Sequence, residues 1–202
     1  MAQIHGRAGG SLATEEARRR WGDQITFQGH EGETSTARIL AETFRDDPQV
    51  HILHDLHIPV DRRGRPERGT GQIDHIVVAG RRVVVIDSKR WTPGRIWTWG
   101  GKTRRGLRRF PAADKRTVGL AVDRLRAYLG VALVEGLIVV HPAGKGPLRL
   151  GLYRPADRVR ACTADQAPAV LRHILGKDAQ SAPDPRVIAA LDRLLIAARR
   201  PA

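Results

Sequence analysis

The chain of 202 residues is poor in cysteine and has no long apolar run. Cys162 is its only cysteine, so an intramolecular disulfide is excluded and a zinc site built from thiolates is not expected. No apolar run reaches the length of a membrane-spanning helix, and the first residues lack the apolar segment of a signal peptide. We therefore expect a cytoplasmic protein without a membrane partner.

Acidic residues are few compared with basic ones. The chain has 35 Lys and Arg against 21 Asp and Glu, which gives a formal net charge of +14. No acid occurs from Ser88 to Ala113, where many Lys and Arg residues fall. This imbalance predicts an anionic partner, with nucleic acid as the first choice. The residues expected to contact phosphates are Arg90, Arg95, Lys102, Arg104, Arg105, Arg108 and Arg109.

Three tryptophans, Trp91, Trp97 and Trp99, lie in the same acid-free segment. Aromatic rings among arginines suit base stacking next to phosphate contacts. The alternative is that Trp97, or the pair Trp91 and Trp99, packs against the sheet. Trp97 and Trp99 share one face if residues 94–99 form a strand, so both could lie against a core. The sequence leaves both interpretations open.

Length and periodicity indicate one mixed α/β domain with a central sheet covered on both sides. We divide it into an N-terminal segment with a short helix (1–26), a core (27–162) and a C-terminal helical extension (163–202). Apolar periodicity predicts helices over residues 13–21, 31–45, 114–129, 163–175 and from 187 on. Strands are predicted over residues 50–59, 72–79, 82–89, 94–99, 102–110, 131–140 and 158–162, and residues 1–11 are expected to be loose.

The most informative stretch is residues 71–89, which predicts a β-hairpin with a two-residue turn at 80–81. This register brings Asp74 opposite Asp87 and places Lys89 on the same face. Opposed side chains lie roughly 4.5–5.5 Å apart at Cβ, and two carboxylates there repel by on the order of 3 kcal/mol. An otherwise apolar hairpin keeps such a pair only if something offsets the repulsion.

Three explanations for the opposed carboxylates remain open. A divalent cation would offset the repulsion, because hard cations bind carboxylate oxygens. Lys89 could instead neutralise one Asp in a structural ion pair. A slip in strand register would separate the two acids.

Neighbouring residues would complete a site for phosphodiester hydrolysis around such a cation. Lys89 can orient or deprotonate the attacking water, or stabilise developing negative charge. The Ser88 carbonyl offers a further metal ligand, and Gln72, which faces Lys89 in this register, can hydrogen-bond the lysine or the water. Glu33 points toward the same face, although a Glu in a first helical turn is more simply explained by the helix dipole. His75 points to the opposite face and is expected to be a structural hydrogen-bonding residue.

Together these motifs resemble the nuclease-related domain (NERD), a branch of the PD-(D/E)XK nuclease superfamily. The resemblance covers about residues 27–140, and its most specific part is the spacing between Gln-Ile-Asp-His and Ile-Asp-Ser-Lys. The matching segments are Gly32-Glu33 with Ala37 and Leu40, His54-Asp55-Leu56, Gly71-Gln72-Ile73-Asp74-His75-Ile76-Val77-Val78, Val84-Val85-Ile86-Asp87-Ser88-Lys89 and Gly94-Arg95-Ile96.

The resemblance implies a restriction-endonuclease-like α-β-β-β-α-β core, a Mg²⁺ or Mn²⁺ cofactor, and hydrolysis of nucleic-acid phosphodiesters. DNA is the expected substrate and RNA the alternative. By position, Asp74 and Asp87 correspond to metal ligands and Lys89 to the catalytic lysine. Glu33 corresponds to the family's helix carboxylate, which replaces the helix-dipole explanation. Position 87 is Asp where the superfamily more often has Glu.

We therefore predict a metal-dependent DNA nuclease whose basic segment binds the phosphate backbone without reading sequence. The rival interpretation is a nucleic-acid-binding module that keeps the fold without turnover, and a third is a hydrolase of small molecules or tRNA. Opposed carboxylates argue against a pure binder, because they would repel a polyanion. The terminal helices lie beyond the matched core and offer a surface for homodimerisation.

Overall fold

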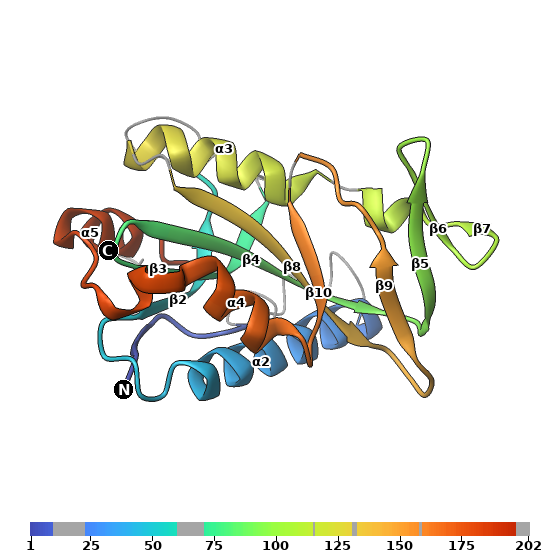
Figure 1. Ribbon diagram of the computed structural model, residues 1–202, viewed down its shortest axis with the longest axis horizontal. Helices are drawn as coiled ribbons and strands as arrows, with labels where there is room; N and C mark the ends of the chain where they lie inside the picture. The colour runs from blue at the N-terminus through green and yellow to red at the C-terminus, as the bar shows by residue number, and fades with distance from the viewer. Residues whose placement is uncertain (10–22, 60–70, 115, 131–132, 158, 197–202) are drawn as a thin grey trace.

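A computed structural model gives the fold of residues 1–9, 23–59, 71–114, 116–130, 133–157 and 159–196, which are the residues described below. Figure 1 shows how the elements are arranged. In chain order they are β1 (Gln3–His5), α2 (Asp23–Thr43), β2 (His51–His57), β3 (Gln72–Ala79), β4 (Arg82–Trp91), β5 (Gly94–Trp99), β6 (Lys102–Arg105), β7 (Arg108–Arg109), the 3-10 helix η1 (Pro111–Asp114), α3 (Thr117–Leu129), β8 (Val134–Pro142), β9 (Leu148–Leu152), β10 (Arg160–Thr163), α4 (Ala167–Leu175), the 3-10 helix η2 (Gly176–Gln180) and α5 (Pro185–Asp192).

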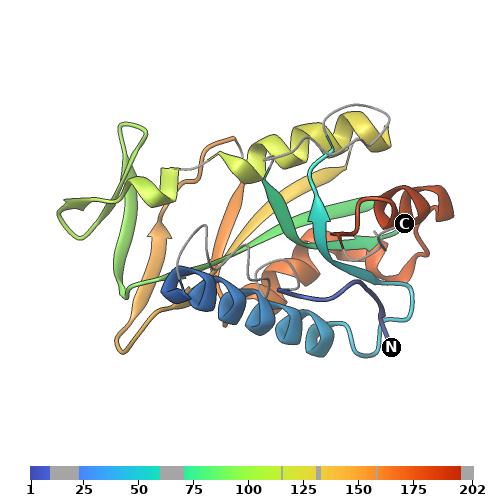
Figure 2. The same cartoon turned by 180° about the vertical axis from the view of Figure 1, so that it is seen from behind.

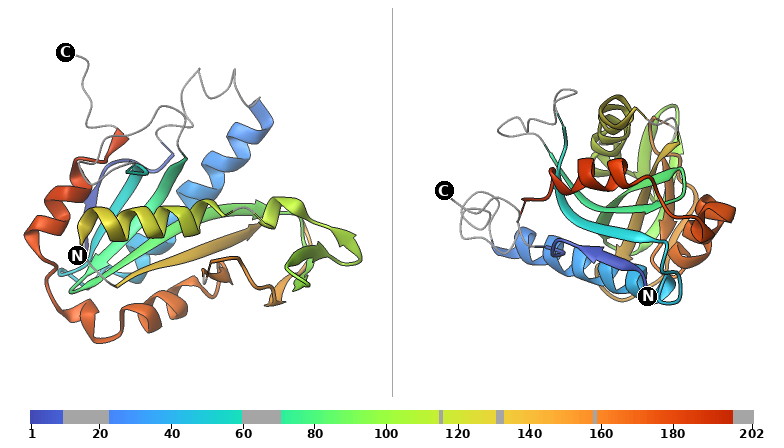
Figure 3. Two further views of the ribbon diagram at one scale, coloured as in Figure 1. Left: turned by 90° about the horizontal axis from the view of Figure 1, so that it is seen from above. Right: turned by 90° about the vertical axis from the view of Figure 1, so that its left-hand side faces the viewer.

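Six strands form one mixed sheet in the order β1-β2-β3-β4-β8-β10. The pairs β2–β3 and β3–β4 are antiparallel, whereas β1–β2, β4–β8 and β8–β10 are parallel. α2 and α3 cover opposite faces of this sheet, as Figures 2 and 3 show. The order α2-β2-β3-β4-α3-β8 is the expected α-β-β-β-α-β core, so the predicted fold class is confirmed.

β3 and β4 form the predicted hairpin in the predicted register. Ala79 pairs with Arg82 and Val78 with Val83, so the turn has two residues. Gly80 takes a φ of 51° in this turn, a conformation that glycine adopts at little cost. Both strands are continuously apolar around the turn because helices cover both faces of the sheet.

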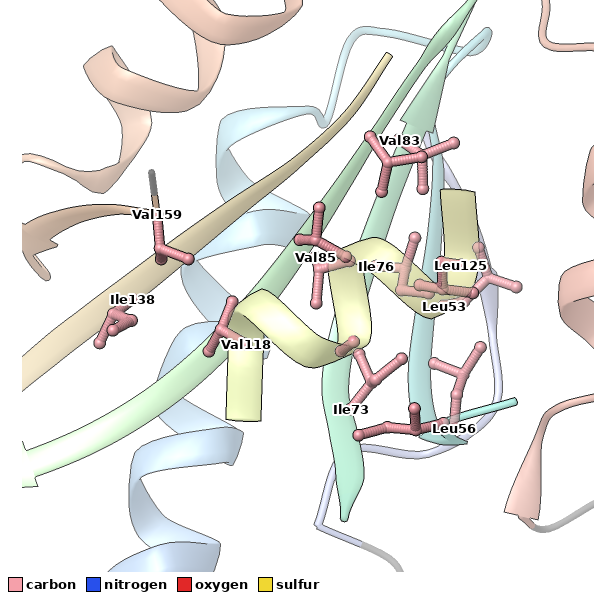
Figure 4. Packing of buried hydrophobic residues seen from close by; sticks show 14 of the residues in the cluster. Leu53, Leu56, Ile73, Ile76, Val83, Val85, Val118, Leu125, Ile138 and Val159 are labelled. Atoms are coloured by element: carbon pink, nitrogen blue, oxygen red, sulfur yellow. The ribbon is translucent and has the colours of Figure 1, made fainter. Parts of the chain in front are cut away.

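Two apolar cores lie on either side of the central sheet. The first lies between the sheet and α3, where Val118 and Leu125 of the helix pack over strand residues such as Val85. Figure 4 shows this packing. The second lies between the sheet and the pair α2 and α4, and it includes Leu40 and Leu171. Apolar residues three and four positions apart give each helix one face that covers the sheet.

A second sheet of four strands, in the order β7-β6-β5-β9, extends from the end of β4 (Figures 1 and 3). Gly100 and Gly101 join β5 to β6, and their φ values of 55° and 70° suit a tight hairpin turn. Ile96 and Thr103 are only 0% and 1% exposed, so one face of this sheet packs on the protein interior. The sequence predicts β5, but not β9 or a separate second sheet.

Several predicted boundaries are wrong. Residues 3–5 are not loose but form β1, which pairs in parallel with β2. α2 begins at Asp23 rather than near residue 31. The strand predicted over residues 102–110 is two short strands, β6 and β7. The helix predicted over residues 13–21 lies outside the described residues.

The two C-terminal helices pack on the central sheet. α4 buries Leu171 and Leu175 in the second core, while Leu191 of α5 and Leu194 just after it lie in the first. Their apolar sides are therefore covered within the chain, and homodimerisation through them stays a prediction. None of the helices in the described ranges combines the length and apolar content needed to cross a membrane.

Candidate active site

Asp74 and Asp87 lie where the pairing between β3 and β4 stops. The last paired residues are His75 and Ile86, so these acids are the next residue on each strand. The Asp74 carboxylate accepts a hydrogen bond from the backbone amide of Ser88, with 2.6 Å between Oδ2 and N. A side chain of β3 thus binds the backbone of β4 at the point where the ladder ends, and this fixes Asp74 beside Asp87.

Lys89 projects to the same side of β4 as Asp87. Its Nζ lies 2.6 Å from Asp87 Oδ1, and the Lys and Asp side chains are 35% and 14% exposed. The structural ion pair that the sequence leaves open is therefore present. Burial disfavours the ammonium, but the carboxylates of Asp87 and Asp74 outweigh this effect and hold the pKa of Lys89 above its usual value. Lys89 is consequently a charged hydrogen-bond donor.

Glu33 reaches the same place from α2. It lies in the middle of this helix, which runs from Asp23 to Thr43, so the helix-dipole explanation is wrong. Glu33 is only 9% exposed. Burial and then the carboxylates of Asp74 and Asp55 raise the pKa of Glu33 to about 9. The helix carboxylate that the family resemblance implies therefore lies among the acids of the hairpin.

The acids of this site repel one another. Burial and then the carboxylate of Asp87 raise the pKa of Asp74 to about 7, against the opposing effects of Lys89 and the Ser88 amide. An added cation would relieve such a strain by favouring the ionised carboxylates. The side-chain acids and the Ser88 carbonyl offer only oxygen donors, which are the ligands that Mg²⁺ and Mn²⁺ prefer.

The acids do not form a preformed metal-coordination site. Within the described ranges, no three acidic, histidine or cysteine side chains are already placed to hold a metal ion. The Asp74 carboxylate accepts a hydrogen bond from the Ser88 amide, and the Asp87 carboxylate accepts one from Lys89. Mg²⁺ is usually held by one or two carboxylates, while waters and substrate phosphates complete its shell. Asp74, Asp87 and the Ser88 carbonyl fit such an open site in donor chemistry.

Asp55 is an acid of this site that the sequence analysis does not single out. It is 5% exposed and lies opposite Asp74, because the pairs on either side of it belong to one β2–β3 register. Its φ of 60° is left-handed, which Asp tolerates better than most residues but which still costs on the order of 1–3 kcal/mol. An acid within an apolar strand, inside the family-like segment His54-Asp55-Leu56, is the signal that could have found it.

A chain of buried polar side chains runs behind the site. His54 Nδ1 lies 2.8 Å from His75 Nδ1, and His75 Nε2 lies 3.2 Å from Ser88 Oγ. The Ser88 hydroxyl donates to Thr36 Oγ1 at 2.9 Å, and Thr36 Oγ1 lies 2.8 Å from His141 Nε2. One direction of donation, from His54 through to His141, satisfies all four hydrogen bonds.

Burial keeps the histidines of this polar chain neutral, and the chain ties α2 to the sheet. Burial lowers the pKa of His54 to about 4 and moves the pKa values of His75 and His141 below their usual value. His75 is thus the structural hydrogen-bonding residue that the sequence predicts. Because Thr36 lies one turn of α2 after Glu33, the hydrogen bond from Ser88 also fixes the helix that presents this carboxylate.

The family is identified by comparison with known sequences. A sequence model of the nuclease-related domain matches residues 28–141, which is more than half of the chain. The chain belongs to the nuclease-related domain family. The matched range runs from α2 into β8 and contains Glu33, Asp74, Asp87 and Lys89. Searches of the curated proteins and of the solved structures found no match.

In this nuclease-related domain Gln72 does not lie directly opposite Lys89 in the observed ladder. It begins β3 and pairs with His57 of β2, while the ladder from β3 to β4 ends at His75. The strands therefore stop pairing before the predicted position is reached. A role for Gln72 at the site stays a prediction.

Some of the residues predicted to contact phosphates interact with other residues of the nuclease-related domain instead. Arg90 forms an ion pair with Glu31 of α2, and Arg109 forms one with Asp114. The guanidinium carbon of Arg105 lies 5.2 Å from the centroid of the Phe110 ring. These three arginines have structural partners, which weakens their assignment to nucleic acid.

The remaining residues that are predicted to contact phosphates lie on the second sheet. Arg95, Lys102 and Arg108 are exposed, and Arg104 is half-buried. Arg95, Lys102 and Arg104 project to one face, which suits a phosphate-binding surface, whereas Arg108 pairs with Arg105 and projects to the other. Contact with nucleic acid stays a prediction. Trp91 is 6% exposed and packs in the first core, so for this tryptophan the packing interpretation is confirmed.

Proposed function

We propose that this protein is a nuclease that hydrolyses phosphodiester bonds of DNA with the help of Mg²⁺ or Mn²⁺. Membership of the nuclease-related domain family supports a nuclease-related function. The observation that carries the proposal is the convergence of Asp74, Asp87, Glu33 and Lys89 at the open end of the β3–β4 hairpin.

Asp74 and Asp87 would hold the cation, with the Ser88 carbonyl as a further oxygen donor and Glu33 beside them. A divalent cation bound there would supply Lewis acidity toward the phosphoryl group and the attacking water. The repulsion that raises the pKa values of Asp74 and Glu33 would be offset at the same time. The relief of this repulsion by a bound cation explains why an apolar hairpin would carry opposed acids.

Lys89 would act as a cationic hydrogen-bond donor. Asp87 orients its ammonium through the 2.6 Å contact, and a pKa above the usual value keeps the group charged at neutral pH. A fixed ammonium can hold the attacking water in place and stabilise the negative charge that builds up on the phosphate. In this protonated form Lys89 does not serve as a general base.

A nucleic-acid-binding module without turnover is the second candidate. The ion pair between Lys89 and Asp87 favours it, because this pair neutralises one carboxylate without a cation. Asp74, Asp55 and Glu33 argue against it, because a binder that holds no cation gains nothing from acids buried together, whose burial and mutual repulsion raise the pKa values of Glu33 and Asp74.

Plasmid cleavage separates the two candidates. We expect the wild type to cut with Mg²⁺ or Mn²⁺ and not with EDTA. Asp74→Asn should slow cutting by at least about a hundredfold, because it removes one proposed ligand charge. The matched control is Asp123→Asn, the same change at a side chain that is 73% exposed on α3. An inactive wild type, or equal cutting by the two variants, would reject the enzyme.

A further inference from the structure

We propose that the second sheet carries a base-stacking platform, built from Trp97 and Trp99, that binds unpaired nucleotides. Its ligand is a single-stranded or frayed nucleic acid, held by bases on the aromatic rings and by phosphates on the neighbouring cations. The choice of ligand rests on the proposed nuclease function and narrows its substrate class.

The two tryptophans form an exposed stack on one face of β5. They are two residues apart on the strand, and their ring centroids lie 6.4 Å apart with 23° between the planes. The Trp97 indole donates from Nε1 to the Gly106 carbonyl at 2.7 Å, which fixes this ring. Trp99 is 73% exposed, so most of its ring surface faces solvent. The pair is therefore a preformed stack with its outer ring open.

Packing does not account for Trp99 as it does for Trp91. Trp91 is 6% exposed and meets Phe110 and Tyr153 edge-on, with ring centroids 5.2 and 5.5 Å apart. Such contacts are how a fold normally uses large aromatic side chains. An indole left 73% exposed adds little to the core, so a ligand is the better explanation for its position.

Cations share the face of the sheet that bears the stack. Trp97 pairs with Arg104 and Trp99 with Lys102 across β5 and β6, and directly paired residues project to the same side. The Arg104 guanidinium carbon lies 5.9 Å from the centroid of the Trp97 ring. The opposite face holds the buried Ile96, so it is the outer face that presents the exposed Trp99 ring beside positive charge. This combination suits bases and phosphates of one strand.

Unpaired rather than paired nucleotides fit this surface. In a duplex the bases are stacked on each other, and only groove edges and phosphates are accessible, whereas an unpaired base can lie flat on an indole. The chain from Lys89 to Trp97 spans at most about 28 Å when fully extended, so the platform lies within that distance of the candidate active site. A nucleic-acid strand of about twelve nucleotides is long enough to span this distance.

Binding without cleavage tests the platform directly. Fluorescence anisotropy in EDTA would compare a labelled single strand of about twelve nucleotides with an abasic strand of the same length and with a duplex. We expect the wild type to bind the base-bearing strand best. Trp99→Ala should weaken that binding about tenfold and barely change binding of the abasic strand, while Trp99→Phe keeps most of the affinity. Leu107→Ala is the control, because Leu107 is a non-aromatic side chain 89% exposed beside β6 and β7.

Any one of three results would overturn the platform. The wild type could bind the abasic strand as well as the base-bearing strand, Trp99→Ala could bind the base-bearing strand as well as the wild type does, or Trp99→Ala could lose equal affinity for both strands. A face that docks a protein instead would give the second result. Binding in EDTA needs no hydrolysis, so an inactive enzyme would leave a positive result intact. Conversely, a failed platform would leave Mg²⁺-dependent plasmid cleavage by Trp99→Ala unchanged.

Discussion

The end of the β3–β4 hairpin and the outer face of the second sheet hold their charges in opposite ways. At the hairpin end the groups are buried or half-buried and fixed by short contacts, as in the hydrogen bonds from the Ser88 amide to Asp74 and from the Lys89 ammonium to Asp87. On the outer face of the second sheet Arg95, Lys102 and Trp99 are exposed. Catalysis needs fixed geometry, whereas binding of a polyanion needs accessible charge. Substitutions in the first region should therefore change rates, and those in the second should change affinities.

The same substitution in the two regions gives the largest expected contrast. Lys89→Met should lower the single-turnover cleavage rate by about 100- to 1000-fold, because it removes a fixed donor from the reacting phosphate. DNA affinity in EDTA should stay within about threefold. Lys102→Met should show the reverse, with a weaker complex and a normal rate at saturating protein. Equal effects of the two variants on rate and on affinity would erase the distinction between the regions.

Charge reversal on the second sheet tests its role in binding. Arg95→Glu/Lys102→Glu should weaken DNA binding about 10- to 100-fold at low salt and flatten the salt dependence of log K by a slope of about two. The control is Arg38→Glu/Arg186→Glu, which makes the same charge change on α2 and α5. Titrations at several salt concentrations measure both quantities. A control that behaves like the test variant would show that only net charge matters.

The pKa of Glu33 predicts how metal-free stability depends on pH. Because it is raised from 4.5 to about 9, the folded protein keeps a proton that the unfolded chain has lost at neutral pH. The unfolded state binds fewer protons, so stability should fall as pH rises from about 7 to 8.5. The loss is on the order of 2 kcal/mol, or roughly 4–8 °C in Tm. Melting curves in EDTA check this, and Glu33→Gln should flatten the slope; an equal slope in this variant would contradict the assignment.

The buried polar chain gives the smallest expected effect. Thr36→Val leaves Ser88 and His141 without a shared partner and should cost about 2 kcal/mol of unfolding free energy. Thr98→Val is the matched control on the second sheet, where the two lost hydrogen bonds, to the carbonyl and from the amide of Arg154, are exposed. It should cost under about 1 kcal/mol. Urea denaturation of both variants measures the difference, and equal costs would contradict the importance of burial.

The hairpin was predictable from sequence because its information is local. A two-residue turn and two apolar runs fix the register from Ala79 back to His75, and this places Asp74 and Asp87 at its end. An ion pair between Lys89 and one of the two acids was also among the explanations that the sequence left open for their opposed charges. What it could not decide is whether this pair or a cation offsets the acids, because the choice depends on burial rather than on spacing.

Other parts of the site depend on contacts between distant segments. Asp55 meets Asp74 through the pairing of β2 with β3 and a left-handed backbone, neither of which periodicity reveals. The hydrogen bond from Ser88 to Thr36 joins residues of a strand and a helix. The second sheet depends on the parallel pairing of β5 with β9, which follows some fifty residues later in the chain. A pattern read along one segment cannot predict any of these.

Anomalous diffraction from crystals soaked in Mn²⁺ would show whether the opposed carboxylates bind a divalent cation. We expect a manganese peak between the carboxylates of Asp74 and Asp87, near the Ser88 carbonyl. A map with no peak there, in which Lys89 still forms its ion pair with Asp87, would contradict a cation site between these acids.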